Sequence, residues 1–121
     1  RETYDKVPKE ELPTRLVLVS NQDILYLKVA EIMRLEASNV YTLFHLQGEG
    51  QPLISSINLG KYVEQFGPYP TFVQTHRSHL INLNFVKKYN KRDRLIVMND
   101  GSEISVSRRF LDDFQNGMQR L

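Results

Sequence analysis

Short apolar runs, several of them alternating with polar residues, fill the first half of the chain and predict β-strands. Five strands are expected, at residues 15–20, 24–27, 31–37, 41–46 and 53–54. The first two form a hairpin, because Asn21-Gln22-Asp23 between them supplies turn-forming side chains. Turns are also expected at 38–40 and at 48–50, where two glycines tolerate positive φ. Strands this short and this closely spaced favour a sandwich or a small stack of sheets.

A helical period replaces the alternation after residue 55. Apolar side chains recur on one helix face at Leu59, Tyr62, Val63 and Phe66. Ser55 or Ser56 is expected to cap this helix, and Gly67-Pro68 to end it. A second helix is expected to start at a Ser107 cap, and its apolar face comprises Phe110, Leu111, Phe114, Met118 and Leu121.

The stretch Phe72 to Asn84 (FVQTHRSHLINLN) begins as a strand, which the polar corner His76-Arg77-Ser78 interrupts. Leu80-Ile81 then restores the apolar pattern. An exposed corner held by buried flanks would present Arg77 on a stiff support, which suits a contact residue. The alternative is a surface turn that carries Arg and His without a function.

Two further strands are expected at 85–89 and 95–98, joined by the basic connector 90–93. Asp100-Gly101 predicts a tight hairpin turn of type I′, and the returning strand covers 103–106. The whole chain therefore reads as mainly β, with two short helices.

Length and composition indicate one domain of ordinary globular composition, at residues 15–121. Residues 1–14 mix charges with two prolines and lack periodicity, so we expect a linker or arm. Because the chain starts at Arg1 and its first dozen residues are polar, we expect a fragment of a longer protein.

No apolar run is long enough for a membrane span or a secretory segment. The absence of cysteine excludes disulfides and thiol chemistry and is compatible with a cytoplasmic location. We expect neither a cofactor nor a metal.

The charge is distributed unevenly, although the net charge is only +2. Residues 72–121 carry nine Lys and Arg against five acidic residues, a balance of +4. The remaining seven basic and nine acidic residues give −2 for residues 1–71. A phosphate-facing surface would produce this asymmetry, and so would a solvated charged face.

Enzyme chemistry finds little support in the sequence. His76 and His79 form a loose pair without a carboxylate or cysteine nearby, and His45 reads as a satisfied, partly buried histidine. Ser78 beside His76 resembles a nucleophile with its base, but no third partner or oxyanion motif accompanies them. We expect no catalytic residue and no small-molecule substrate.

Two arginine corners carry more information. Arg77 lies where a strand breaks, and Arg108 follows Ser107 where a strand meets the last helix. The arginine fork binds guanine edges or phosphates bidentately, and amides at a helix start hold phosphate. Alternatively, Arg108 and Arg109 pair with Asp112 or Asp113 at helical spacing, above all Arg109 with Asp113.

The segments LEASNVYTLFHL (35–46), FVQTHRSHLINL (72–83) and NDGSEISVSRRF (99–110) together resemble LytTR DNA-binding domains, the output modules of bacterial response regulators. The resemblance covers about residues 15–120. It implies an elongated stack of small, mostly antiparallel β-sheets with one or two short helices. It also implies that loops, and not a recognition helix, bind promoter DNA, as a dimer on two direct repeats.

Carried over by position, the resemblance implies base contacts from Asn39, Tyr41, Arg77 and Arg108. Charge and proximity add candidate phosphate contacts at Ser38, Lys87, Lys88, Ser107 and Arg109. The family often has Asn-Tyr in the first turn, whereas this chain has Val40 before the tyrosine and Asn39 one position earlier.

The sequence therefore predicts sequence-specific binding of double-stranded promoter DNA by the output domain of a two-component regulator. The upstream partner is expected to be a receiver domain or a membrane sensor. The rival interpretations are a protein-interaction β module that uses the same rim and a hydrolase that uses Ser78 and His76.

Overall fold

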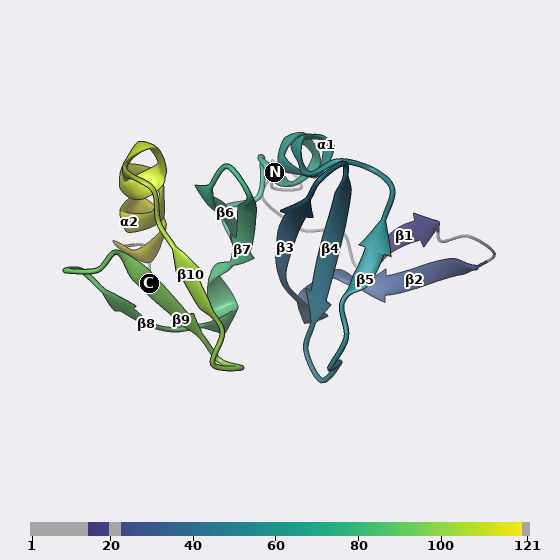
Figure 1. Cartoon of the computed structure of the whole chain (residues 1–121), viewed down its shortest axis with the longest axis horizontal. Helices are drawn as coiled ribbons and strands as arrows, with labels where there is room; N and C mark the ends of the chain where they lie inside the picture. Colours follow the sequence, from purple (N-terminus) through teal and green to yellow (C-terminus); the bar gives the residue numbers. More distant parts are fainter. Residues whose placement is uncertain (1–14, 20–22, 120–121) are drawn as a thin grey trace, which may run out of the picture.

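Three antiparallel sheets stack along the long axis of the molecule (Figure 1). The computed structural model describes residues 15–19 and 23–119. The central sheet has the strand order β5-β4-β3-β7-β6, with the β1-β2 hairpin on one side and the sheet β10-β9-β8 on the other. The predicted elongated stack of small antiparallel sheets with short helices is confirmed.

The strands of the first two sheets are β1 (Arg15–Val19), β2 (Ile24–Lys28), β3 (Ile32–Ser38), β4 (Tyr41–Leu46), β5 (Leu53–Ser55), β6 (Phe72–His76) and β7 (His79–Asn82). The third sheet comprises β8 (Val86–Asn90), β9 (Leu95–Met98) and β10 (Glu103–Ser105). The α-helices are α1 (Leu59–Phe66) and α2 (Leu111–Gln119), and short 3-10 turns cover Val29–Glu31, Leu83–Phe85 and Arg108–Phe110. No helix in the described part is long and apolar enough to cross a membrane.

Two hydrophobic cores lie on opposite faces of the central sheet. One core packs that sheet against the β1-β2 hairpin and α1, and the other packs it against the third sheet and α2. Because neighbouring residues of a strand point to opposite faces, β7 places Leu80 in the first core and Ile81 in the second. The polar corner between β6 and β7 is therefore supported by packing on both faces of the sheet.

Helix α1 starts later than the serines predicted. Its cap is Asn58, whose Oδ1 accepts a hydrogen bond from the Lys61 amide at 3.1 Å. Ser55 remains in β5, where its hydroxyl hydrogen-bonds the Tyr62 hydroxyl at 2.7 Å in the core. The Ser55 or Ser56 cap is therefore wrong, because core packing recruits Ser55 and Asn58 supplies the side-chain acceptor.

Two other local predictions also differ from the structure. Ser107 lies at the start of the last helical segment, but its side chain makes no capping hydrogen bond. In the β9-β10 hairpin only Gly101 has positive φ, at 90°, so the turn is not type I′. The Met98 amide instead donates to the Ser102 carbonyl, which closes a three-residue loop.

Candidate nucleic-acid interface

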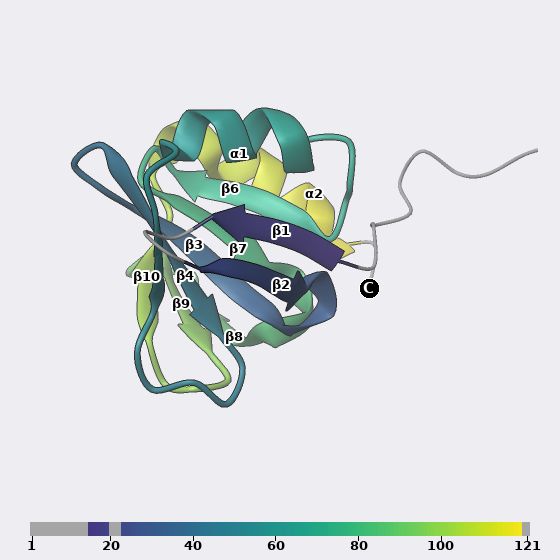
Figure 2. The ribbon, with the colours of Figure 1, turned by 90° about the vertical axis from the view of Figure 1, so that its right-hand side faces the viewer.

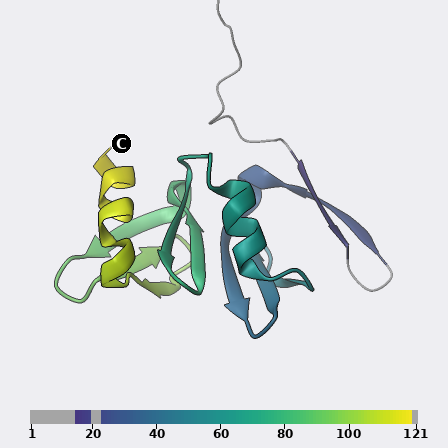
Figure 3. The same ribbon diagram turned by 90° about the horizontal axis from the view of Figure 1, so that it is seen from above.

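Four turns lie along one side of the molecule (Figure 3). They are the β3-β4 turn (38–41), the β6-β7 turn (76–78), the turn before α2 (106–109) and the β8-β9 turn (91–94). We call these four segments the turn row. Figure 2, viewed along the long axis, shows the β3-β4 turn and the end of β6 on the same left-hand side.

Main-chain hydrogen bonds, made by the turns or by the strand residues directly before them, connect neighbouring members of the turn row. Three bonds of 2.9 Å run from Ala37 N to Ser78 O, from Ser107 N to Thr75 O and from Val106 N to Arg94 O. Each bond joins segments that are distant in the sequence. The spacing between the four turns is therefore set by backbone geometry and not by flexible side chains.

The β3-β4 turn places three predicted contact residues at an exposed tip. Asn39 adopts a left-handed backbone with φ 55°, which asparagine tolerates better than most residues. Ser38 pairs with Tyr41 across the turn and is half-buried. Val40 and Tyr41 are 66% and 47% exposed, so an apolar and an aromatic side chain protrude here.

The β6-β7 turn presents Arg77 to solvent. His76 and His79 pair across the turn, and the Ser78 amide donates to Nδ1 of His76 at 3.1 Å. Nδ1 of His76 is the acceptor of this hydrogen bond, so the His76 ring stabilises the turn. His76 is half-buried and supports the turn that carries the exposed Arg77.

The turn before α2 exposes two more arginines. The Phe110 amide donates to the Ser107 carbonyl at 3.0 Å, which starts the 3-10 turn. Arg108 and Arg109 are both exposed, and the Arg109 guanidinium lies 5.2 Å from the Phe110 ring centroid. Phe110 thereby positions Arg109 through a cation–π contact.

The two arginine corners meet in one depression of about 360 Å³. Its lining comprises His76, Arg77, Ser107, Arg109 and Phe110. The structure therefore brings Arg77, Ser107 and Arg109 together, while Arg108 lies outside this lining. No ion pair formed between described residues involves Arg77, Arg108 or Arg109, so the alternative Arg109–Asp113 pair is absent among them.

Lys87 and Lys88 lie apart from the depression. Both are exposed on β8, the edge strand of the third sheet, where a register shift falls between Val86 and Lys88. Sequence reasoning did not single out the side chains of the neighbouring β8-β9 turn, although the basic character of the 90–93 connector was the available signal.

A polar cluster lies on β3 and β4 of the central sheet. Oε1 of Glu36 lies 2.9 Å from Nε2 of His45 and 3.3 Å from Nη1 of Arg34. Burial acts to raise the pKa of Glu36, but its bond to His45 and the Arg34 charge bring that pKa below its usual value. The interpretation of His45 as a satisfied, partly buried histidine is confirmed.

Burial also lowers the pKa of both His45 and His79, and the Arg34 charge adds to this in each case. The neutral form of each ring is thereby favoured in the folded protein. Nδ1 of His79 is buried and finds no hydrogen-bond partner among the described residues.

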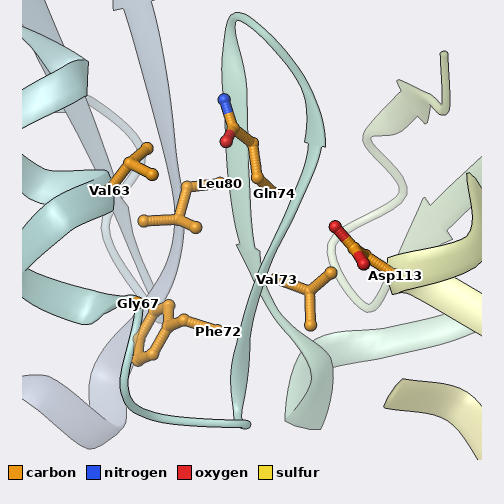
Figure 4. A pocket seen from close by; sticks show the side chains of 7 residues that line it. All are labelled: Val63, Gly67, Phe72, Val73, Gln74, Leu80 and Asp113. Carbon is orange, nitrogen blue, oxygen red and sulfur yellow. The ribbon is translucent and has the colours of Figure 1, made fainter. Parts of the chain in front are cut away.

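A second hollow of about 210 Å³ lies over β6 between α1 and α2. Figure 4 shows Val63, Phe72, Val73 and Leu80 around it, with Gln74 and Asp113 as its polar side chains. The described residues that line this hollow include no cationic side chain, so they lack the chemistry for phosphate. Within residues 15–19 and 23–119, no group of three or more His, Asp or Glu side chains is placed to bind a metal.

Comparisons with known proteins agree with this arrangement. The sequence model of the LytTr DNA-binding domain family matches residues 15–119. The structure is similar to the LytTr DNA-binding domain of a methyl-accepting/DNA response regulator from Bacillus cereus, with TM-score 0.70 and 20% identity. That similarity covers 88% of this chain and 97% of the other and concerns the fold. No curated protein sequence matches. The chain belongs to the LytTR family of DNA-binding domains.

Proposed function

We propose that this domain binds double-stranded promoter DNA sequence-specifically through the turn row. It acts as the output domain of a bacterial two-component transcriptional regulator in the cytoplasm. The observation that carries the proposal is the shared depression in which Arg77 lies beside Ser107 and Arg109. Exposed guanidinium groups without a described ion-pair partner suit a polyanionic ligand.

The turns divide the work between reading bases and holding phosphates. Asn39, Tyr41, Arg77 and Arg108 contact base edges in the major groove. Ser38, Lys87, Lys88, Ser107 and Arg109 contact phosphates, which fixes the register of the domain on the duplex. The chain needs no catalytic residue, cofactor or small-molecule substrate for this function.

Regulation comes from outside the described domain. An upstream receiver domain or a membrane sensor is the expected partner, and two copies occupy direct repeats as a homodimer. Phosphorylation upstream promotes this pairing, because a linked second site raises the effective concentration of the domain.

Selection of random duplexes on the domain, followed by sequencing, tests the proposal. Enriched DNA should contain two similar motifs about one helical repeat apart. Arg77→Ala should weaken binding to the selected duplex by about 1–3 kcal/mol, because it removes a bidentate base contact. Arg15→Ala is the matched control, since Arg15 is an exposed arginine at the start of β1.

The rival is a protein-interaction module that uses the same rim. Phosphate-driven binding loses affinity by orders of magnitude between low and moderate salt, whereas an apolar protein contact changes little. A folded Arg77→Ala variant that binds the enriched DNA like the parent would reject our proposal.

A further inference from the structure

The β8-β9 turn concentrates positive charge at one end of the turn row. Lys91, Arg92 and Arg94 stand within four consecutive positions, with Asp93 as the only acid. Lys91 and Arg92 are exposed and Arg94 is half-buried. The amide of Asp93 donates to Oδ1 of Asn90 at 3.0 Å, which holds the turn closed.

Arg94 occupies a backbone conformation that arginine disfavours. Its φ is 50°, in the left-handed region that glycine adopts at far lower cost. Its main-chain carbonyl accepts the Val106 hydrogen bond, a role that any residue fills. Its side chain makes no ion pair with a described residue. The fold therefore does not explain why arginine stands where glycine would be more stable.

The same hydrogen bond places the turn next to the proposed phosphate site. Val106 directly precedes Ser107, so the Arg94–Val106 bond fixes the base of the β8-β9 turn beside the depression. Figure 3 shows this turn and the start of α2 on one side of the molecule. A polyanion bound at Ser107 and Arg109 would extend toward it.

Asp93 does not neutralise the positive charge of the β8-β9 turn. Nε of Arg92 lies 3.6 Å from Oδ1 of Asp93, and both side chains are largely exposed, at 89% and 55%. Solvent screening makes such a pair weak, so Arg92 is free to exchange this partner for a phosphate.

We propose that Lys91, Arg92 and Arg94 form an additional phosphate-binding element, which holds the DNA backbone next to the stretch bound by Ser107 and Arg109. This inference rests on the proposed function and adds residues to its interface. It makes the footprint longer than the base-contacting turns require, and it contributes affinity without base preference.

Arg94→Gly tests the inference, because glycine removes the charge and relieves the backbone at once. The variant should unfold at the same or a higher temperature than the parent, yet bind the selected duplex about three- to tenfold more weakly. The slope of log K against log salt should become shallower by about 0.9. The double variant Lys91→Gln/Arg92→Gln should make this slope shallower by roughly twice that amount.

Lys28→Gln is the matched control, because it removes one exposed positive charge at the end of β2, which points to the right in Figure 2, away from the β3-β4 turn on the left. It should leave the slope unchanged, and all of these variants should enrich the same DNA motif as the parent.

This inference would be overturned if the slope of log K against log salt were unchanged in both Arg94→Gly and the Lys91/Arg92 double variant. If Arg77→Ala still lost binding, the proposed function would stand. A large drop in the unfolding temperature of Arg94→Gly would also overturn it, since arginine would then be structural. Failure to enrich any duplex would instead reject the proposed function itself.

Discussion

At the scale of single residues, the cap of α1 shows how the tertiary structure chooses among equivalent side chains. Ser55, Ser56 and Asn58 are all good N-cap residues, so sequence alone does not rank them. The buried hydrogen bond between Ser55 and Tyr62 keeps Ser55 in β5. Asn58 then has the extended backbone and the free amide acceptor that the Lys61 amide needs.

We therefore predict that Asn58→Ala lowers the free energy of unfolding by about 1 kcal/mol, because the first turn of α1 loses its side-chain acceptor. Urea denaturation followed by circular dichroism measures the change. Ser56→Ala is the comparison, since Ser56 is exposed and forms no cap. Equal stability of the two variants would argue against the Asn58 cap.

Three ionisable residues of the central sheet predict sensitivity to acid. The folded state lowers the pKa of His45 and His79, so the unfolded chain takes up protons first as the pH decreases. The stability from these two residues is complete above about pH 6.5 and is lost below it. Glu36, whose pKa is also lowered, adds a loss below about pH 4.5.

Thermal unfolding between about pH 8 and pH 5 checks this expectation, and the midpoint should fall most steeply below about pH 6.5. His45→Gln keeps a donor toward Glu36 but does not titrate, so its midpoint should change less over this range. A parent protein with a constant midpoint would show that neither ring is held neutral by the fold.

At the scale of elements, the local pattern located most strands, including β4 at its observed bounds. It could not give their partners, because pairings such as β3 with β7 join strands about forty residues apart. The local sequence pattern was also insufficient to predict the turn type of the β9-β10 hairpin. Asp100 accepts hydrogen bonds from the Ser102 amide and hydroxyl at 2.9 and 2.7 Å, which favours the longer loop over a type I′ turn.

The candidate site also has features that the sequence could predict and others that it could not. The arginine corners at 77 and 108 were visible as polar residues between apolar flanks, and the family resemblance supplied their roles. Their neighbourhood was not visible, because the bond from Ser107 to Thr75 links positions thirty-two residues apart. That bond brings Arg109, and not Arg108, into the depression with Arg77.

Helix α2 depends on a close approach to the central sheet. A Cβ atom at Gly117 would lie 2.9 Å from Cδ1 of Leu83 and 3.3 Å from Cγ2 of Val73. We predict that Gly117→Val destabilises the domain by about 1–3 kcal/mol, because both neighbours belong to a packed core. Chemical denaturation gives the value.

Gln115→Val supplies the control for this prediction, because it introduces the same β-branched residue at an exposed position of the same helix. Valine forms helices better than glycine, so helix propensity cannot account for a loss in Gly117→Val. A Gly117→Val domain that loses no more stability than Gln115→Val would show that the position tolerates a side chain beside Leu83 and Val73.

At the scale of the whole molecule, the stacked sheets give the domain its length and place the turn row along it (Figures 1 and 3). Packing on both faces of the central sheet supports the β6-β7 turn, while the outer sheets carry the domain beyond it in both directions. The entire fold thus determines where the proposed DNA contacts lie.

The three backbone hydrogen bonds that connect the turns have a consequence for recognition. Under the proposed function, side-chain substitutions would change which bases the turns prefer. They would leave the distances between the turns intact, because amides and carbonyls set those distances. Because such a protein surface is rigid, the double helix and not the protein has to deform when the two bind. The proposed function therefore predicts that the local stiffness and groove width of the DNA contribute to the choice of site, also at base pairs that no residue contacts.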